Sequence, residues 1–412
     1  MHFNYNKSAF VHQWYPFVEG YSREFINTII TEIGYKPNFA LDLFSGSGTT
    51  PVELQLMGTK CYSFEVSPFM HLLASVKLEG HYKVNKFRES LQLVENKLND
   101  ELLPIREFIQ PPKATTFQPN GKLKKWIFNV EVMDGILDIK NAIRCVNDVK
   151  YQQLFSIALA SILLEVSNAY RNGKCLAYKD NWQTIITTRR NVHEKFLDKL
   201  RNVILPDILK LQKIKVNGGN KKYCIYGDVR ENINKIPDNT IDLVITSPPY
   251  LNSRDYTDIY IAELWMLDLI KDYDELRGLR KRTLRSHVQV KHGEVKTLDI
   301  HELKATIDKL NNNKEQEWNS EILGMVKGYF VDMDLLFSDL KKKMVPGKKV
   351  FFNVANSAYY GVEIKVDEIV CAIAETKGFT INEIRKARDL RPSSQQKDLI
   401  SSLRESVIVM TS

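Results

Sequence analysis

Short apolar runs alternate with helical patterns near the start of the chain. Residues 39–44 (FALDLF) form an apolar run that ends in the turn SGSGTT, and residues 51–58 (PVELQLMG) continue with helical spacing. Residues 60–65 (KCYSFE) form a second apolar run, and a further helical pattern follows at 66–78 (VSPFMHLLASVKL). These patterns predict strand, turn and helix twice in succession. Two consecutive βα units predict a parallel sheet that is covered by helices.

The alternation stops between about residue 80 and residue 215, where the pattern becomes mostly helical. Residues 89–105 and 151–170 both carry apolar side chains at three- and four-residue intervals. A Pro-rich, basic segment at 110–126 separates these two stretches. Because the whole region is far too long for a connection, we expect a helical insertion at 81–215.

Strand signals return in the second half of the chain. They fall at 222–226 (KYCIY), 241–246 (IDLVIT) and 348–354 (KKVFFNV), with VPGKK as the turn into the last of these. Helical patterns occupy 258–270, 322–344 and 366–378, with Gly378 placed as the residue just after a helix end. FTINEIRKAR and LRESVIVM then predict two closing strands. Apart from the insertion, the chain predicts five βα units and a terminal ββ pair. The expected fold is therefore α/β: a doubly wound sheet of seven strands whose last two form an antiparallel end.

The composition is that of an ordinary globular protein with a basic surplus. The 412 residues are enough for a large core, and the formal net charge of +8 permits a polyanionic partner without requiring one. The five cysteines are scattered without metal-ligand spacing, which favours reduced thiols and predicts no metal site. The N-terminus lacks a secretory pattern, and no apolar run approaches the roughly 20 residues that span a bilayer. We therefore expect a cytoplasmic protein without membrane contact.

The first glycine turn has the pattern of a nucleotide site. Residues 42–50 (DLFSGSGTT) follow the first strand, where a doubly wound sheet binds nucleotides. Glycine lets the backbone approach a ligand closely, and the first amides of the next helix point at that ligand. No GK[ST] follows the glycines, and Pro51 stands where a dinucleotide fingerprint places its third glycine. As a site, the turn favours a nucleoside without a pyrophosphate, whereas a purely structural turn would show the same short pattern.

Two acids follow neighbouring strands. Glu65 ends the second strand, where a carboxylate can accept hydrogen bonds from both ribose hydroxyls. Asp228 follows the third strand, where it can accept from an adenine amino group. Either acid alone could be a solvated strand end, but three adjacent strand ends with matching chemistry favour a nucleoside site.

The end of the fourth strand is the most informative segment. Residues 241–250 (IDLVITSPPY) run from a buried strand into two prolines, which cannot extend a ladder. The turn leaves the Ser247 hydroxyl and nearby carbonyls at the sheet edge beside the Tyr250 ring. A hydroxyl and a carbonyl could hold the two N–H groups of a base amine, and the ring could stack on a base swung out of a helix. The alternative is a simple strand-ending turn with a core tyrosine.

Together these residues resemble the amino-methyltransferases of restriction–modification systems, in which an FxGxG motif binds S-adenosylmethionine and a [DNS]PP[YFW] motif holds the target amine. The first motif is Phe44-Ser45-Gly46-Ser47-Gly48 here, and the second is Ser247-Pro248-Pro249-Tyr250. The resemblance covers residues 10–80 and 220–412. It implies a Rossmann-like methyltransferase domain divided into residues 1–80 and 216–412, with the insertion at 81–215 as a candidate DNA-recognition subdomain.

The resemblance also implies roles for individual residues. The family places an aromatic segment before the glycine motif to cradle the methionine part of the cofactor, and Trp14 and Tyr15 match it by position. The expected catalytic residues are Ser247, Pro248, Pro249 and Tyr250. The expected cofactor-binding residues are Trp14, Tyr15, Asp42, Phe44, Ser45, Gly46, Gly48, Thr49, Thr50, Glu65, Asp228 and Ser247.

The motif form bears on the target base. The Thr-Ser-Pro-Pro-Tyr form is similar to that of N4-cytosine enzymes, whereas adenine enzymes more often carry Asp or Asn before the prolines. The glycine motif precedes the Ser-Pro-Pro-Tyr motif here, which departs from the commoner N4-cytosine order. N6-adenine therefore remains the alternative target, and an RNA or protein-glutamine methyltransferase or a DNA-binding protein without activity is more remote. No cysteine lies in the motif, which disfavours C5-cytosine chemistry.

Basic residues suggest where duplex DNA would lie. The region 271–320 contains a stretch at 277–296 that is rich in Lys and Arg and holds one acid, Glu294. A solvated loop would show the same composition. The candidate DNA contacts are Arg254, Arg280, Lys281, Arg282, Arg285 and Lys291. A second basic group lies at 122–126, and a polar group at 388–396 could contact DNA or cofactor. The resemblance also implies a cognate restriction endonuclease as a functional partner.

Overall fold

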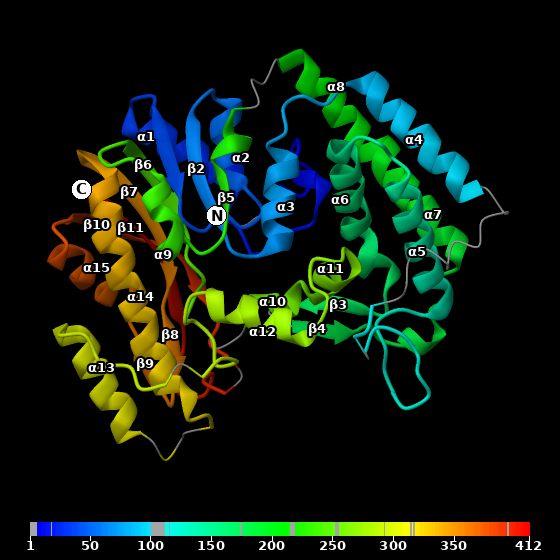
Figure 1. Cartoon of the computed structure of the whole chain (residues 1–412). Coiled ribbons are helices and arrows are strands. Elements are labelled where there is room, and N and C mark those ends of the chain that lie inside the picture. Colours follow the sequence, from blue (N-terminus) through cyan, green and yellow to red (C-terminus); the bar gives the residue numbers. More distant parts are fainter. Residues whose placement is uncertain are drawn as a thin grey trace.

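A seven-stranded, mostly parallel sheet forms the centre of the computed structural model (Figure 1). The structure describes residues 6–17, 19–99, 112–114, 116–173, 175–214, 219–251, 255–291, 293–313, 315, 318–393 and 395–412. The sheet order is β10-β11-β7-β6-β1-β2-β5. The strands are β1 (Phe39–Asp42), β2 (Lys60–Glu65), β5 (Cys224–Tyr226), β6 (Ile241–Thr246), β7 (Met344–Ala355), β10 (Thr380–Leu390) and β11 (Leu403–Thr411).

The strand directions follow the predicted pattern. β5, β2, β1, β6 and β7 pair in parallel, and β11 is antiparallel to both β7 and β10. The predicted seven-stranded α/β sheet with an antiparallel end is therefore confirmed. β11 lies between β7 and β10 and is antiparallel to both, so within this sheet it alone runs opposite to the other strands.

Helices cover both faces of the sheet because successive strand residues point to opposite sides. Ala40, Leu243 and Ile245 pack against α1 on one face, whereas Leu41 and Val244 pack with α14 and α15 on the other. The helices that flank the sheet are α1 (Arg23–Ile33), α2 (Thr49–Leu56), α3 (Pro68–Lys77), α9 (Val229–Asn232), α14 (Glu321–Lys343) and α15 (Val366–Thr376). Gly378 has a φ of 82° just after the end of α15, as predicted.

The insertion forms a helical group beside α3 (Figure 1). Its helices are α4 (Val84–Asn99), α5 (Val130–Arg144), α6 (Val149–Val166), α7 (Arg189–Asp198), the π-helix η5 (Lys199–Ile204) and α8 (Leu205–Ile214). These helices share one hydrophobic core with α3 and α11 (Ile261–Met266). Among the described helices, α6 alone is long and apolar enough to cross a membrane, which the sequence did not lead us to expect, but most of it is buried in this core.

A β-hairpin interrupts the insertion where a helix was expected to continue to residue 170. α6 ends at Val166, and β3 (Ala169–Asn172) pairs with β4 (Cys175–Tyr178). The Ser167 hydroxyl donates to the carbonyl oxygens of Leu164 and Ala169, and the Asn168 side chain donates to the carbonyl oxygen of Trp126. Such local side-chain bonds compete with the helix and end it.

Several of the segments that connect β6 to β10 differ from those that the sequence predicted. The helix expected at 258–270 is two shorter helices, α10 (Tyr256–Ile259) and α11, and the VPGKK turn lies inside β7, where Gly347 has a φ of 77°. α12 (Tyr273–Arg282) and α13 (His301–Asn312) follow α11, and β8 (Ser357–Tyr359) pairs with β9 (Val362–Ile364) after β7. Short 3-10 helices complete the fold: η2 (His12–Trp14), η4 (Trp182–Thr184), η6 (Asn220–Tyr223) and η7 (Ile233–Lys235).

Candidate functional site

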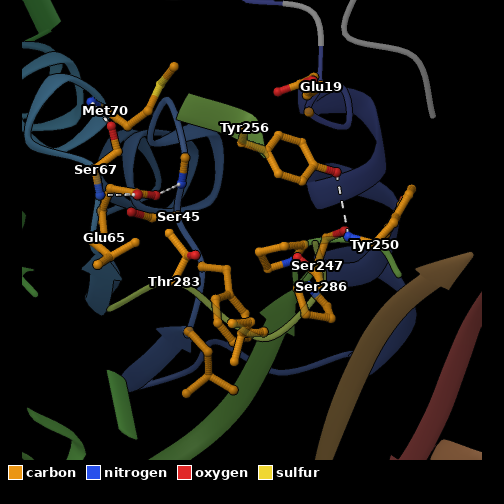
Figure 2. Close-up of a pocket in the computed structure, with 18 of the residues that line it drawn as sticks. Glu19, Ser45, Glu65, Ser67, Met70, Ser247, Tyr250, Tyr256, Thr283 and Ser286 are labelled. Atoms are coloured by element: carbon orange, nitrogen blue, oxygen red, sulfur yellow. Dashed lines mark hydrogen bonds between the residues drawn. The ribbon is translucent and has the colours of Figure 1, made fainter. Parts of the chain in front are cut away.

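One pocket of about 540 Å³ collects the motif residues at the carboxyl ends of the parallel strands. Figure 2 shows Ser45, Glu65 and Ser67 on one side of it, and Ser247, Tyr250 and Tyr256 on another. The sequence-predicted residues that line the pocket are Phe44, Ser45, Gly46, Thr49, Glu65, Asp228, Ser247, Pro248, Pro249, Tyr250 and Arg282. Ligands of open α/β sheets bind at this edge, so the two motifs face one common space.

The glycine turn keeps its shape because two residues adopt left-handed backbone conformations. Gly46 has a φ of 49° and Gly48 a φ of 82°, both in the region that favours glycine. A Cβ on Gly48 would lie 3.0 Å from the Cβ of Ala74 on α3, and a Cβ on Gly46 would lie 3.3 Å from Cζ of Phe17. Gly46 therefore keeps the pocket wall open, whereas Gly48 lets α3 pack closely.

Glu65 lies at the end of β2 and ties the turn to the next loop. Its Oε2 accepts from the Gly46 amide at 2.8 Å, and its Oε1 accepts from the Ser67 amide at 2.8 Å. Burial raises the pKa of Glu65 to about 7, although both amide bonds oppose the shift. A carboxylate oxygen has two lone pairs, so each can accept a further hydroxyl. A half-buried acid with spare acceptor capacity fits the ribose of a nucleoside.

Asp42 joins the two motif loops instead of lining the pocket. Its Oδ1 accepts from the Thr246 hydroxyl at 2.8 Å and from the Phe44 amide at 3.2 Å. Burial raises the pKa of Asp42 to about 6. Thr50, also expected at the cofactor, is buried against the Tyr21 hydroxyl, and Gly48 faces α3. Asp42, Gly48 and Thr50 thus hold the loops in place and are not part of the pocket lining, and their expected contact with the cofactor stays a prediction.

The aromatic segment expected before the turn, residues 12–17 (HQWYPF), reaches the pocket only with its last residue. Trp14 and Tyr15 are fully buried and do not line the pocket. The Trp14 Nε1 donates to Asp207, and the Tyr15 hydroxyl donates to Glu263 at 2.6 Å, so their polar atoms are used in the core. Phe17 lines the pocket instead.

Two neighbouring groups complete the cofactor end of the pocket. Tyr260 stacks on Phe17 with ring centroids 6.0 Å apart, and Arg171 from β3 lies over the Tyr260 ring at 4.8 Å. Both Tyr260 and Arg171 line the pocket. The insertion hairpin therefore supplies a pocket residue that the sequence did not indicate.

Asp228 lines the pocket and also begins α9. Its side chain accepts from the Arg230 amide at 2.9 Å and from the Arg230 guanidinium. The preceding Gly227 donates its amide to the Glu65 carbonyl oxygen at 2.9 Å, which holds the ends of β5 and β2 together. The third strand end thus lies beside the second, as the sequence predicted.

The Ser-Pro-Pro-Tyr corner rests on polar side chains of the neighbouring strands. The Tyr250 hydroxyl donates to Oε1 of Glu405 at 2.7 Å, and Nδ2 of Asn353 donates to the Tyr250 oxygen at 2.9 Å. Burial and the Glu405 charge raise the pKa of Tyr250 well above its ordinary value, so the phenol stays protonated. Asn353 and Glu405 line the pocket, and no sequence motif marked either residue.

The basic residues near the pocket divide into two kinds. Arg280 pairs with Asp255 and Asp258, and Arg285 pairs with the buried Asp332, so both guanidinium groups have carboxylate partners within the protein and their contact with DNA stays a prediction. Buried carboxylates require these partners. Lys281, Arg282 and Lys291 are exposed, and Arg282 lines the pocket rim. Arg254 lies outside the described residues.

The basic group at 122–126 and the polar group at 388–396 differ in their position relative to the pocket. Lys122, Lys124 and Lys125 are not part of the pocket lining, and Nζ of Lys125 lies 5.3 Å from the centre of the Tyr178 ring. Arg388 and Arg391 from the C-terminal group line the pocket. The fold and the pocket together define a class: α/β enzymes that bind a nucleoside at the carboxyl edge of the sheet, beside a second polar corner.

Comparison with curated proteins narrows this class. The chain is 27% identical to the Type II methyltransferase M.BsoBI of Geobacillus stearothermophilus over 440 aligned positions, which cover 95% of the chain and 83% of the relative. It is 26% identical to the Type II methyltransferase M.AvaI of Nostoc sp. (93% and 82% covered) and 24% identical to the Type II methyltransferase M.MvaI of Kocuria varians (80% and 72% covered). No family model and no solved structure matches. The chain is an enzyme similar to Type II methyltransferases, and S-adenosylmethionine is its methyl donor, as predicted.

Proposed function

We propose that the protein is a site-specific DNA methyltransferase that methylates the N4 amine of cytosine in duplex DNA, as part of a restriction–modification system in the cytoplasm. The observation that carries this proposal is the single pocket shared by the glycine turn, Glu65, Asp228 and the Ser-Pro-Pro-Tyr corner. The similarity to Type II methyltransferases over nearly the whole chain supports the methyltransferase part of this proposal.

The cofactor end of the pocket fits S-adenosylmethionine. Glu65 is half-buried with spare acceptor capacity for the ribose hydroxyls, and Gly46 leaves open a space that a Cβ would narrow. Asp228 at the next strand end is the acceptor for the adenine amino group, and Phe17 and Tyr260 form an aromatic wall. The cofactor supplies an electrophilic methyl group that needs no activation by the protein.

The substrate end holds the target base. The base leaves the DNA stack, at a cost of about a few kcal/mol, and stacks on Tyr250. Ser247 Oγ and the Pro248 carbonyl oxygen accept the two N–H groups of the amine and fix its lone pair in the direction of the methyl group. Proximity and alignment supply most of the rate acceleration. Phosphate contacts come from Lys281, Arg282 and Lys291, the exposed members of the predicted basic group.

Transfer of labelled methyl groups tests this function. Incubation with duplex DNA and tritiated S-adenosylmethionine, followed by digestion to nucleosides, is expected to give N4-methylcytosine. Recovery of N6-methyladenine would show that the target base is adenine and not cytosine, while the enzyme would still be a DNA methyltransferase. Preferential labelling of RNA would refute DNA as the substrate. Sequencing of methylated plasmid at single-molecule level then gives the recognition site.

A further inference from the structure

A row of polar side chains crosses the sheet below Tyr250. Asn353 lies on β7, Glu405 on β11 and Arg388 on β10. Glu405 is directly opposite Arg388 in one strand pair and opposite Ala355 in the other, so Asn353, two residues before Ala355, lies diagonal to it on the same face. Arg388 pairs with Oε2 of Glu405. The row thus runs from a surface arginine to the Ser-Pro-Pro-Tyr corner.

The donors and acceptors in this row have a fixed direction. A carboxylate only accepts, so the phenol proton of Tyr250 lies towards Oε1 of Glu405, 2.7 Å away. The Tyr250 oxygen is then free to accept, and it does so from Nδ2 of Asn353 at 2.9 Å. The nearby Ser247 side chain also acts on the phenol and lowers its pKa against the effect of burial. The same Nδ2 donates to Oε1 of Glu405 at 3.0 Å and lies 3.4 Å from Ser247 Oγ. The Ser247 and Tyr250 hydroxyls therefore share Nδ2 of Asn353, and the Tyr250 hydroxyl ends on the Glu405 carboxylate.

Methylation of an amine requires a proton acceptor, and this row of polar side chains can supply one. Ser247 alone is a poor base at neutral pH, yet a methylated amine must lose a proton. Hydrogen bonds in a chain polarise one another, so a terminal carboxylate makes the first hydroxyl oxygen a stronger acceptor. Glu405 is only 3% exposed, and a ring that served only for stacking would need no buried acid beneath its hydroxyl.

We propose that Glu405 is the terminal acceptor of the proton that the target amine releases, through Ser247 and Tyr250. The amine nitrogen forms its bond to the methyl carbon while the carbon–sulfur bond breaks and its electron pair stays on sulfur. The surplus proton moves from nitrogen to Ser247 Oγ, the Ser247 proton moves to the Tyr250 oxygen, and the Tyr250 proton moves to Oε1 of Glu405. The carboxylate becomes a carboxylic acid, which Arg388 then helps to return to its ionised form. This inference rests on the proposed function.

Tyr250→Phe is the decisive variant, because it breaks the chain and keeps the ring. Single-turnover methyl transfer to the duplex site is expected to slow by about 100-fold, within the usual range for loss of a general base. DNA affinity and the fluorescence of 2-aminopurine placed at the target position should stay at wild-type levels, because stacking is retained. Tyr329→Phe is the matched control, since the buried Tyr329 hydroxyl has no hydrogen-bond partner among the described residues.

Glu405→Gln tests the end of the chain. It should slow transfer to a similar extent, and the Tyr250→Phe/Glu405→Gln double variant should be no slower than the slower single variant, because the two residues act as one unit. A melting curve checks that each variant folds. The relay would be overturned if Tyr250→Phe transferred the methyl group at the wild-type rate. It would also be overturned if the rate and the 2-aminopurine fluorescence of this variant fell in parallel. Failure of the wild-type enzyme to methylate DNA would instead count against the proposed function.

Discussion

Glu65→Gln should weaken binding of S-adenosylmethionine without unfolding the protein. Both carboxylate oxygens of Glu65 accept a backbone amide at 2.8 Å, from Gly46 and Ser67. The amide of glutamine keeps one acceptor but turns a donor towards the other N–H group. It also removes a charged acceptor from the ribose hydroxyls, and a hydrogen bond to a charged group contributes about 1.5–3 kcal/mol. The dissociation constant should therefore rise by about 10- to 150-fold.

The same carboxyl predicts a pH dependence of cofactor binding. The pKa of Glu65 in the folded protein is about 7, because burial disfavours its charged form. The folded state therefore holds a proton between pH 4.5 and 7 that the unfolded state has released, so this group stabilises the fold below pH 4.5 and loses that contribution as the pH rises through 7. Ribose hydroxyls bind the ionised form better, so cofactor affinity should increase up to about pH 7 and then level off. The Asp42 carboxyl, with its pKa raised to about 6, adds to the acid side of this profile.

Isothermal titration calorimetry with S-adenosylmethionine between pH 5.5 and 8.5 measures both effects. Glu65→Gln should bind weakly and should lose most of the dependence around pH 7. Glu95→Gln, on α4 and paired with Arg201, removes a carboxylate elsewhere and serves as the control. Affinity of Glu65→Gln within twofold of the wild type at pH 8 would refute the assignment of Glu65 to the ribose.

Four further variants test other parts of the structure. Gly48 has a φ of 82°, and a Cβ at this position would lie against α3. Gly48→Ala should therefore lower the free energy of unfolding by about 1–2 kcal/mol, measured by calorimetry. Arg282→Ala should weaken DNA binding and reduce its salt dependence. Arg285→Ala should mainly destabilise the fold, because it removes one of the two arginines that pair with the buried Asp332. Equal effects of both variants on the salt slope of DNA binding would contradict this division. The buried Lys77 has its pKa lowered to about 7, so the folded state binds fewer protons than the unfolded state above that pH. The wild type should therefore gain stability between pH 7 and 10 relative to Lys77→Met, in denaturant titrations at each pH.

The sequence predicted which segments meet at the pocket wherever each segment is a short local pattern. The glycine turn, Glu65 and the Ser-Pro-Pro-Tyr corner each follow a buried strand directly, and parallel strands bring their carboxyl ends to one edge. A strand pattern and a turn pattern were therefore enough to place them together.

The parts that the sequence missed depend on distant partners. Arg280 and Arg285 have the composition of a DNA-binding stretch, but the aspartates that engage them come from α10 and α14. Tyr15 matched an aromatic cradle by position, but its hydroxyl is taken by Glu263 on α11. Long-range ion pairs and core contacts of this kind leave no periodic signal along the chain, so composition alone could not reveal these partners.

The reversed strand explains why Glu405 lies at the active edge. In a wholly parallel sheet, only residues that follow a strand reach the edge where ligands bind. β11 runs against its neighbours, so its first residues lie at that edge, while its last residue, Thr411, pairs with Lys349 near the start of the parallel part of β7. Glu405 is the third residue of β11, and its partner Arg388 lies near the end of β10. The antiparallel end of the sheet therefore supplies the buried acid and its counter-charge from the opposite ends of two strands, beside the corner that we propose holds the target amine.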